Sequence, residues 1–309
     1  MNTTQAEIGV RIPQRLLVAV DADAISDNAI DAGIELARRF GAQIELLHVF
    51  RNSMFGTEYV AEAQQVAAGS DLATEVTRFV QDHVRRVLTA AQSSLRAEDV
   101  LHVLPGLPAR VLLDRARATQ ADLLVLGSLR RRPVVDFGST ARAILAKASC
   151  PVLVQPGPRT TIRSILVPVD LSTESFLALA TACTWARVLR ARVHALHGFD
   201  TSVAKGGRAL GGIAVAGAVD VLVERARREF EAAMAAFDWG GVDHATTFFE
   251  GEPVGRILDE AKSADMIAMG THGRTGFAAL LLGSVAYAVL QRATKPVLVV
   301  RDAERTFLA

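Results

Sequence analysis

Three glycines and a serine near the end of the chain have the types and the spacing of a phosphate-binding loop. Two residues separate Gly270 from Gly273, nine separate Gly273 from Gly283, and Ser284 follows directly. Glycine lets the backbone approach an anion closely and turn its N–H groups toward it. A serine there can cap a helix or donate its hydroxyl to a phosphate oxygen. A plain turn with a helix cap would use the same residues, so the pattern alone leaves both interpretations open.

The segments around these glycines predict the strand, loop and helix that an anion site needs. The apolar run 266–269 predicts a buried strand, 285–292 has a helical pattern, and 297–300 predicts a second strand. The first turn of the helix would add unpaired N–H donors and a partial positive charge at the end of the loop. The order of these elements therefore favours a site for a negatively charged ligand.

The spacing Gly-x2-Gly-x9-Gly-Ser resembles the ATP-binding signature of the universal stress protein family. The resemblance covers about residues 10–302 and favours the phosphate interpretation over the plain turn. It implies that Pro168 and Asp170, which match the family's Pro-x-Asp, contact the adenosine, and that Met269 packs near the base. The residues that it assigns to the ribose and the phosphates are Gly270, Gly273, Gly283, Ser284 and Val285.

Composition limits the class of protein. The 309 residues suit two domains, and the net charge of +1 gives no electrostatic footprint for nucleic acid or an anionic membrane. The apolar run 277–290 has 14 residues and is too short to span a bilayer, and the first residues lack the apolar core of a signal peptide. The two cysteines lie in apolar segments, which is typical of buried free thiols. We expect a cytoplasmic protein that neither enters a membrane nor binds nucleic acid.

The chain contains the same unit twice. LLVAVD at 16–21 matches ILVPVD at 165–170, and His48 matches His197 at the same offset. Gly-x-Pro occurs at 106–108 and again at 251–253. The segment 155–161, QPGPRTT, reads as a linker. We therefore predict two domains, 1–157 with a degenerate nucleotide motif and 158–309 with an intact one.

Each copy alternates five predicted strands with four predicted helices. The strands are predicted at 15–21, 43–50, 98–104, 122–127 and 151–155, and at 164–169, 192–198, 244–250, 265–270 and 296–301. The helices are predicted at 26–40, 71–95, 108–120 and 139–148, and at 173–190, 218–237, 253–264 and 284–293. Such alternation predicts an α/β fold with a parallel sheet covered on both faces. The resemblance implies two tandem open five-stranded sheets of the Rossmann-like, adenine nucleotide alpha hydrolase-like type, with the nucleotide across the ends of strands one and four.

Three residues of the second copy have open alternatives. Asp170 ends a strand, where its carboxylate can accept a hydrogen bond from a ribose hydroxyl or an adenine amino group, or can be a second cap for the next helix, whose predicted N-cap is Ser172 or Thr173. Arg274 is a phosphate clamp or a solvated loop charge. Gly198 stands where the family usually has an aliphatic residue against the adenine, so the second copy departs from the pattern there. His197 is interpreted as a buried structural histidine.

The first copy reads as a degenerate site. It keeps Asp21, Val49, Gly127, Gly138, Ser139 and Thr140 at matching positions. Ala19 replaces the proline, Arg130 replaces the middle glycine, and the loop is two residues shorter. Arg130 cannot adopt the positive φ that glycine tolerates, and aspartates crowd the neighbouring helix start. The arginines 130–132 bind a phosphate, pair with those aspartates or are solvated; we favour the last two. The sequence predicts one binding copy and one scaffold copy.

The motifs favour binding over fast catalysis. The chain has no GxxxxGK[ST], no HExxH and no cysteine–histidine zinc spacing. We predict no metal site of the protein's own and no catalytic residue; Mg²⁺ would arrive with ATP, and Asp170 would help to hold it. The predicted function is a tandem universal stress protein that binds ATP in its second domain and acts as a nucleotide-responsive stress or regulatory factor. The alternatives are a slow ATP or adenine-nucleotide hydrolase and a nucleotide-free adaptor for a partner protein.

Two further expectations concern assembly and loops. The last strands of the copies, PVLVQ and PVLVV, are short apolar edges that would pair within the chain as an intramolecular pseudo-dimer, with a homodimer as the alternative. The segments 51–70 and 199–218 lack a helical period, and each is a lid, a partner surface or a plain loop.

Overall fold

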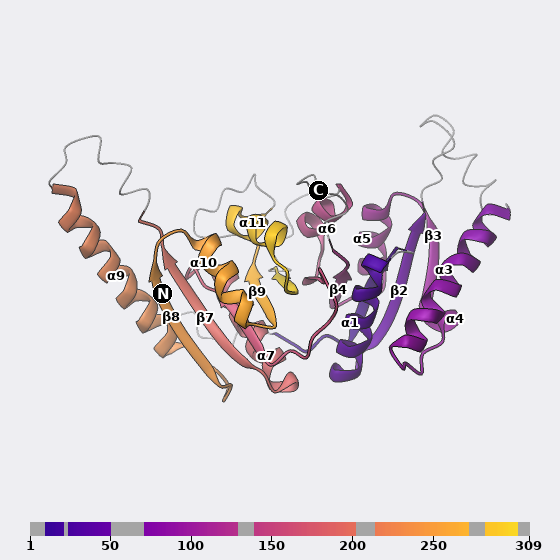
Figure 1. The fold of residues 1–309 in the computed structure, drawn as a ribbon, viewed down its shortest axis with the longest axis horizontal. Helices are drawn as coiled ribbons and strands as arrows, with labels where there is room; N and C mark the ends of the chain where they lie inside the picture. The colour runs from indigo at the N-terminus through magenta and orange to yellow at the C-terminus, as the bar shows by residue number, and fades with distance from the viewer. Residues whose placement is uncertain are drawn as a thin grey trace. The chain divides into compact units, whose positions relative to one another are not determined.

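The computed structural model describes residues 10–21, 24–50, 71–128, 139–201, 214–271 and 282–301. These residues form two compact units, 13–159 and 160–301, which divide within the predicted linker; residues 10–12 belong to the second unit (Figure 1). They are called the N-terminal unit and the C-terminal unit below. The outer limits of the predicted domains lie outside the described residues, so the limits 1–157 and 158–309 stay predictions.

Both units have a parallel sheet with one strand order. The strands of the N-terminal unit are β1 (Arg15–Val20), β2 (Gln43–Phe50), β3 (Leu101–Pro105), β4 (Leu123–Leu126) and β5 (Val152–Val154). Those of the C-terminal unit are β6 (Ser164–Pro168), β7 (Arg192–Phe199), β8 (His244–Glu250), β9 (Met266–Gly270) and β10 (Val297–Val300). The order is β3-β2-β1-β4-β5 in one unit and β8-β7-β6-β9-β10 in the other. The predicted fold class is confirmed.

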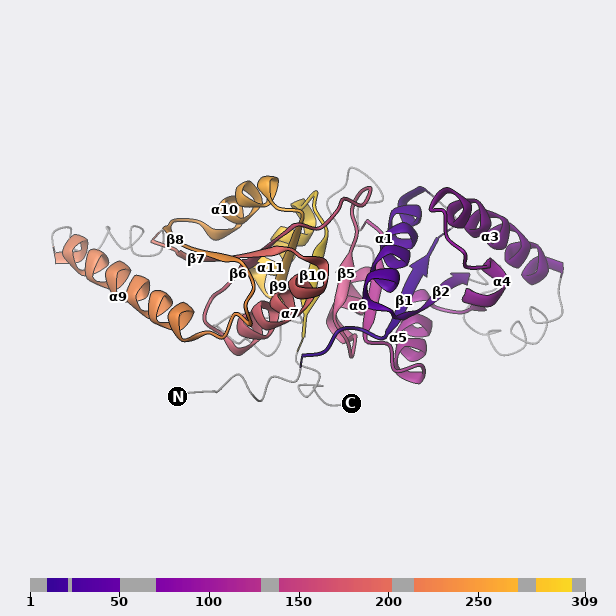
Figure 2. The ribbon, with the colours of Figure 1, turned by 90° about the horizontal axis from the view of Figure 1, so that it is seen from below.

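Helices cover both faces of each sheet (Figure 2). In the N-terminal unit α1 (Ala24–Phe40) packs with α3 (Asp71–Ala90) on one face, and α5 (Pro108–Ala118) with α6 (Ser139–Lys147) on the other. In the C-terminal unit α7 (Thr173–Leu189) and α9 (Ala214–Ala236) share a face, and α10 (Pro253–Glu260) packs against α11 (Ser284–Arg292) on the opposite face. A 3₁₀ turn, Ala261–Ser263, follows α10. The strands β4, β9 and β10 are almost wholly buried, as apolar runs in such sheets should be.

The two units repeat the same polar contacts. Asp122 accepts hydrogen bonds from the backbone N–H of Gln14 and Arg15, each at 2.9 Å, and Asp265 does the same for the start of β6. Each aspartate thus ties the strand that follows it to the first strand of its unit. His48 and His197 each donate from Nδ1 to the backbone carbonyl at the end of that first strand, at 2.8 and 2.6 Å. The prediction that His197 is structural is confirmed, because this buried ring also stacks on Phe230.

Three predicted element limits are wrong. Residues 98–100 belong to a short helix, α4 (Ala97–Val100), because Glu98 and Asp99 favour a first helical turn over a strand. The helix predicted to reach residue 95 ends at Ala90, and Gln92 beyond it takes a left-handed φ of 52°. The helix predicted from 218 begins at Ala214, inside the segment predicted to lack a helical period. The other limits agree within two residues, apart from the helix predicted to end at 264, because α10 ends at Glu260 and the 3₁₀ turn follows it.

Candidate functional site

The candidate site lies where the strand order of the C-terminal sheet reverses. β6 has β7 on one side and β9 on the other, both parallel to it. The chain leaves β6 toward α7 on one face and leaves β9 toward α11 on the opposite face. Connections that diverge in this way open a crevice at the carboxyl ends of the strands, which is where α/β sheets bind ligands. A pocket of about 350 Å³ occurs at this place.

Most of the predicted site residues meet at this pocket. Those that line it are Pro168, Asp170, Gly198, Met269, Gly270, Gly283, Ser284 and Val285. They come from four separate segments of the chain, which sequence spacing alone cannot bring together. Gly273 and Arg274 lie outside the described residues, so both interpretations of Arg274 stay open. Residues that line the pocket but were not predicted are Val169, Ser175, Leu196, Phe249, Pro253, Ile257, Thr271 and Ala286.

Gly270, the first glycine of the motif, is required by packing. A β-carbon added there would lie 2.9 Å from the backbone carbon and the Cβ of Glu174 in α7. The helix backbone cannot withdraw as a flexible side chain could, so α7 and β9 approach each other only because residue 270 is glycine. Gly270 also lines the pocket, so this close approach lies at the pocket wall.

Among the described residues, no side chain caps the N-terminus of α11. Its N-cap is Gly283, whose own N–H donates to the carbonyl of Thr271 at 2.6 Å. By contrast, α7 is capped by Ser172, one of the two predicted candidates, which accepts from the N–H of Ser175, and α10 is capped by Glu252, which accepts from two N–H groups of its first turn. Because Gly283 and the first three residues of α11 line the pocket, its first turn offers N–H donors to an anion there.

Asp170 sits in a tight turn at the end of β6. Its Oδ1 accepts hydrogen bonds from the backbone N–H and the hydroxyl of Ser172, at 3.0 and 2.5 Å. Leu171, between them, has a φ of 65°, a left-handed conformation that costs a non-glycine residue roughly 1–2 kcal/mol. The turn fixes the direction of the carboxylate. Among the described residues that line the pocket, Asp170 is the one carboxylate.

Gly198 and Phe249 stand opposite each other in the register of β7 and β8. A β-carbon on Gly198 would lie 2.4 Å from Cζ of Phe249, so the ring occupies the space that a larger residue at 198 would need. Sequence reasoning noted the missing aliphatic side chain at 198 and missed its replacement. The sequence alone could not pair the two positions, because the pairing depends on the register of β7 and β8.

The corresponding residues of the N-terminal unit are only partly described. Asp21 and Gly127 follow the ends of β1 and β4, Val49 lies in β2, and Thr140 lies in the first turn of α6. Ser139 begins α6, while Arg130 and Gly138 lie outside the described residues. The prediction of a degenerate site there stays a prediction.

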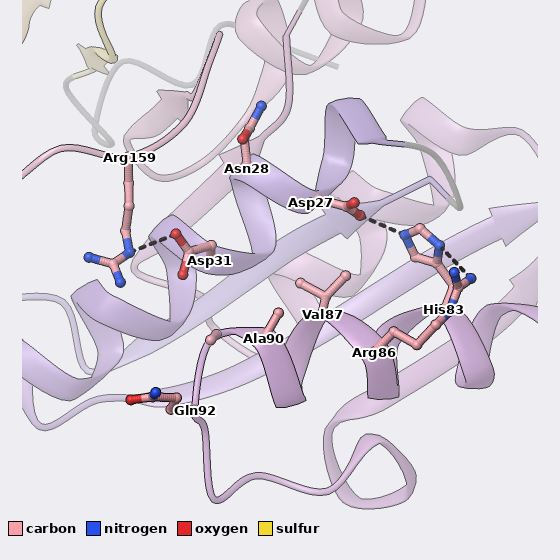
Figure 3. A pocket seen from close by; sticks show the side chains of 10 residues that line it. Asp27, Asn28, Asp31, His83, Arg86, Val87, Ala90, Gln92 and Arg159 are labelled. Atoms are coloured by element: carbon pink, nitrogen blue, oxygen red, sulfur yellow. Dashed lines mark hydrogen bonds and ion pairs between the residues drawn. The ribbon is translucent and has the colours of Figure 1, made fainter.

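A different pocket, of about 650 Å³, lies between α1 and α3 of the N-terminal unit (Figure 3). Arg86 donates to Nδ1 of His83 at 3.4 Å, and His83 donates from Nε2 to Asp27 at 2.6 Å. Asp31 pairs with Arg159 at 2.7 Å. The two helix aspartates thus have partners within the described chain other than the arginines 130–132. These contacts join residues far apart in the sequence, and the predictions did not include them.

The described residues offer neither a metal-ligand cluster nor a membrane-spanning helix. No three histidine, cysteine, aspartate or glutamate side chains among them are grouped so that they could hold a metal ion. No helix in the described part of the chain combines the length and the apolar character needed to cross a membrane.

Comparisons with known proteins point to one family. A model of the universal stress protein family matches residues 13–156 and again 161–301. A universal stress protein of Mycolicibacterium smegmatis is 29% identical over 93% of this chain and 96% of its own length. One from Mycobacterium tuberculosis is 30% identical over 74% of this chain and 79% of its own. The crystal structure of a universal stress protein from Archaeoglobus fulgidus has a TM-score of 0.62 at 18% identity, covering 93% of this chain and 98% of that one, and shares the fold.

Proposed function

The chain belongs to the universal stress protein family, with two of its domains in tandem, and from that premise we propose that the C-terminal unit binds an adenine nucleotide, ATP by the resemblance of its motif. One observation carries the proposal. Residues chosen from sequence spacing, on β6, β7, β9 and the start of α11, converge on a single pocket at the reversal point of the sheet.

The chemistry of the pocket suits a nucleotide because its two sides differ. Leu196, Phe249 and Ile257 lie on the side of β7, β8 and α10. The uncapped first turn of α11 lies beyond β9. Strands lie about 4.8 Å apart, so roughly 14 Å separates β8 from β9 across β7 and β6. An elongated ligand with an apolar base and an anionic tail matches this arrangement, with the base toward β8 and the phosphates toward α11.

Asp170 lies between these two sides, at the end of β6. In the proposal its carboxylate accepts a hydrogen bond from the ribose, or helps to hold an Mg²⁺ that enters with the nucleotide. Magnesium suits the second role, because it keeps several waters and needs few protein ligands beside a triphosphate.

We propose further that the nucleotide acts as a signal, so that the protein is a stress or regulatory factor of the cytoplasm whose binding to a partner protein changes with nucleotide occupancy. A homodimer and the pairing of the two final strands within one chain stay predictions. Slow hydrolysis is the alternative within the same pocket, and steady release of phosphate that stops in Gly273→Arg would establish it. The other alternative is an adaptor that binds a partner protein and no nucleotide.

Calorimetric titration of the nucleotide-stripped protein with ATP and Mg²⁺ tests the proposal. We expect one site per chain in the wild type. Gly283→Val places a branched side chain at the uncapped helix start and should weaken binding at least about tenfold, since charged hydrogen bonds of roughly 1.5–3 kcal/mol each are lost there. The matched control is Gly138→Val, the corresponding position of the first copy, which should bind like the wild type. Absence of binding by the wild type would refute the proposal and favour the adaptor.

A further inference from the structure

The two copies differ at one pair of opposed positions near the carboxyl ends of their sheets. In the N-terminal unit Val49 of β2 stands opposite Leu104 of β3. In the C-terminal unit the corresponding pair is Gly198 of β7 and Phe249 of β8. Glycine therefore stands at 198 where the first copy has valine, and phenylalanine stands at 249 where the first copy has leucine. Because opposed residues of neighbouring strands point to the same face, the ring occupies the space that the glycine leaves.

The geometry of Phe249 shows how far it reaches. Its Cζ, Cε1 and Cε2 atoms lie 2.4–2.9 Å from the place where a β-carbon of residue 198 would be, so the far end of the ring extends over β7. It lines the pocket and is half-buried, which leaves ring surface for a ligand to cover. The next residue back, Phe248, faces the other way, with the Arg227 guanidinium 4.5 Å from its centroid. Only the second of these two phenylalanines lines the pocket.

A salt-bridged arginine stands beside the ring. The guanidinium carbon of Arg256 lies 5.7 Å from the centroid of Phe249, within the range of a cation–π contact. Arg256 is itself paired with Glu260, at 2.7 Å, one turn further along α10. Glu260 and Arg256 therefore restrain the ring at the edge of the pocket, and a preorganised aromatic surface costs less entropy when a ligand stacks on it.

From these contacts we infer that Phe249 is the base-stacking and specificity-determining residue of this pocket, replacing the aliphatic wall that Gly198 lacks. The inference rests on the proposed function and adds to it the requirement of a planar aromatic base. A ring at this place stacks on purines through its face, whereas an aliphatic wall only excludes water. The pocket has about 350 Å³ with the ring in place, within the range of small-molecule sites, so the ring forms a wall and does not fill the space.

The test compares ATP with tripolyphosphate, which carries the charge of the nucleotide tail and no base. Both are titrated, the second by competition with ATP, into the full-length stripped protein and its Phe249→Leu variant. A stacked aromatic pair contributes about 0.5–1.5 kcal/mol more than the burial of the same area. Loss of this contribution should weaken ATP binding about three- to tenfold in the variant. Tripolyphosphate binding should not change. A merely structural defect would weaken both ligands alike, so the ratio of the two affinities is the diagnostic quantity.

Two further variants complete the design. Phe248→Leu makes the same change on the adjacent, opposite-facing residue and should leave the ATP affinity unchanged. The double variant Gly198→Val/Phe249→Leu rebuilds the pair of the N-terminal unit without the clash that Gly198→Val alone would cause, and should bind ATP as weakly as Phe249→Leu or slightly more tightly.

The outcomes separate the inference from the proposed function. If the wild type does not bind ATP, both are overturned. If the wild type binds ATP and Phe249→Leu binds it equally well, or loses ATP and tripolyphosphate in the same proportion, only the inference about Phe249 is overturned. Tighter ATP binding by Phe249→Leu would also overturn it, because the ring would then be occupying the place of the base.

Discussion

At the scale of single residues, Gly270 combines two tasks that one substitution can measure. Its missing side chain lets α7 approach β9, and its backbone lines the pocket. Gly270→Ala should destabilise the C-terminal unit by about 1–3 kcal/mol, the usual cost of overpacking against rigid backbone. Both tryptophans, Trp185 and Trp239, lie in this unit, so urea unfolding followed by tryptophan fluorescence reports on it directly.

The control for that prediction is Gly157→Ala. A β-carbon at Gly157 would meet nothing within 4 Å. Its unfolding midpoint should match the wild type, since a β-carbon that meets no neighbour should change the stability by no more than about 0.5 kcal/mol. Equal midpoints for Gly270→Ala and Gly157→Ala would contradict the packing account of the motif's first glycine.

The two cysteines give a second test at the residue scale. Burial raises the pKa of both the Cys150 and the Cys183 thiol to about 12. The thiolate is the reactive form, so neither residue should react with a disulfide reagent in the native protein near pH 8. We expect no thiol to be titrated under native conditions and two in denaturant. Rapid native reaction of either cysteine would show that its surroundings open readily.

At the scale of elements, one substitution at the start of α11 should raise the stability of the helix and lower the affinity for ATP. Ser284 is exposed and is the first residue of α11, so Ser284→Asp adds a carboxylate at the start of this helix. Such a carboxylate should stabilise the helix by about 0.3–1 kcal/mol. It should also repel a phosphate at the same N–H groups and weaken ATP binding about tenfold or more. Stability and affinity therefore move in opposite directions, which a defect in folding would not produce.

The repeat supplies the control for this element. Ser139 begins α6 in the N-terminal unit, as Ser284 begins α11. Ser139→Asp should leave the ATP affinity unchanged. If Ser139→Asp lowers the affinity for ATP and Ser284→Asp does not, the nucleotide binds in the N-terminal unit and the proposal is wrong.

Element positions were predictable from the sequence because buried parallel strands are continuous apolar runs and each was present twice. The position of α4 could not be predicted, because its four residues are too few to show a helical period and only the charges of Glu98 and Asp99 mark it. Residues at the ends of β6 and β9 could be chosen from motif spacing. Phe249 could not, because its role depends on strand register, and the pair Asp27–His83 joins residues 56 apart in the chain.

At the scale of the whole molecule, the half-buried His194 makes stability depend on pH. Desolvation lowers the pKa of His194, whose Nε2 lies 2.9 Å from the Thr247 hydroxyl; Arg192 and Arg256 also lower it and Glu260 raises it. Below about pH 6.5 the unfolded chain then binds more protons at this site than the folded chain, so stability falls as the pH falls. Between about pH 7.5 and 5.5 the C-terminal unit should lose stability.

The matched variant isolates this residue. His194→Gln keeps an N–H donor near Thr247 and does not titrate. Its loss of stability between the same two pH values, measured by tryptophan fluorescence in urea, should be smaller than that of the wild type. Equal losses would assign the pH dependence to other groups.

A crystal structure of the full chain, from crystals grown with ATP and Mg²⁺, would show whether one nucleotide binds in the C-terminal unit. We expect density for one nucleotide per chain, with the base against Phe249, the phosphates at the N-terminus of α11 and Asp170 beside the ribose or the metal ion. Density in the N-terminal unit, or a C-terminal pocket that stays empty at saturating ATP, would contradict this expectation.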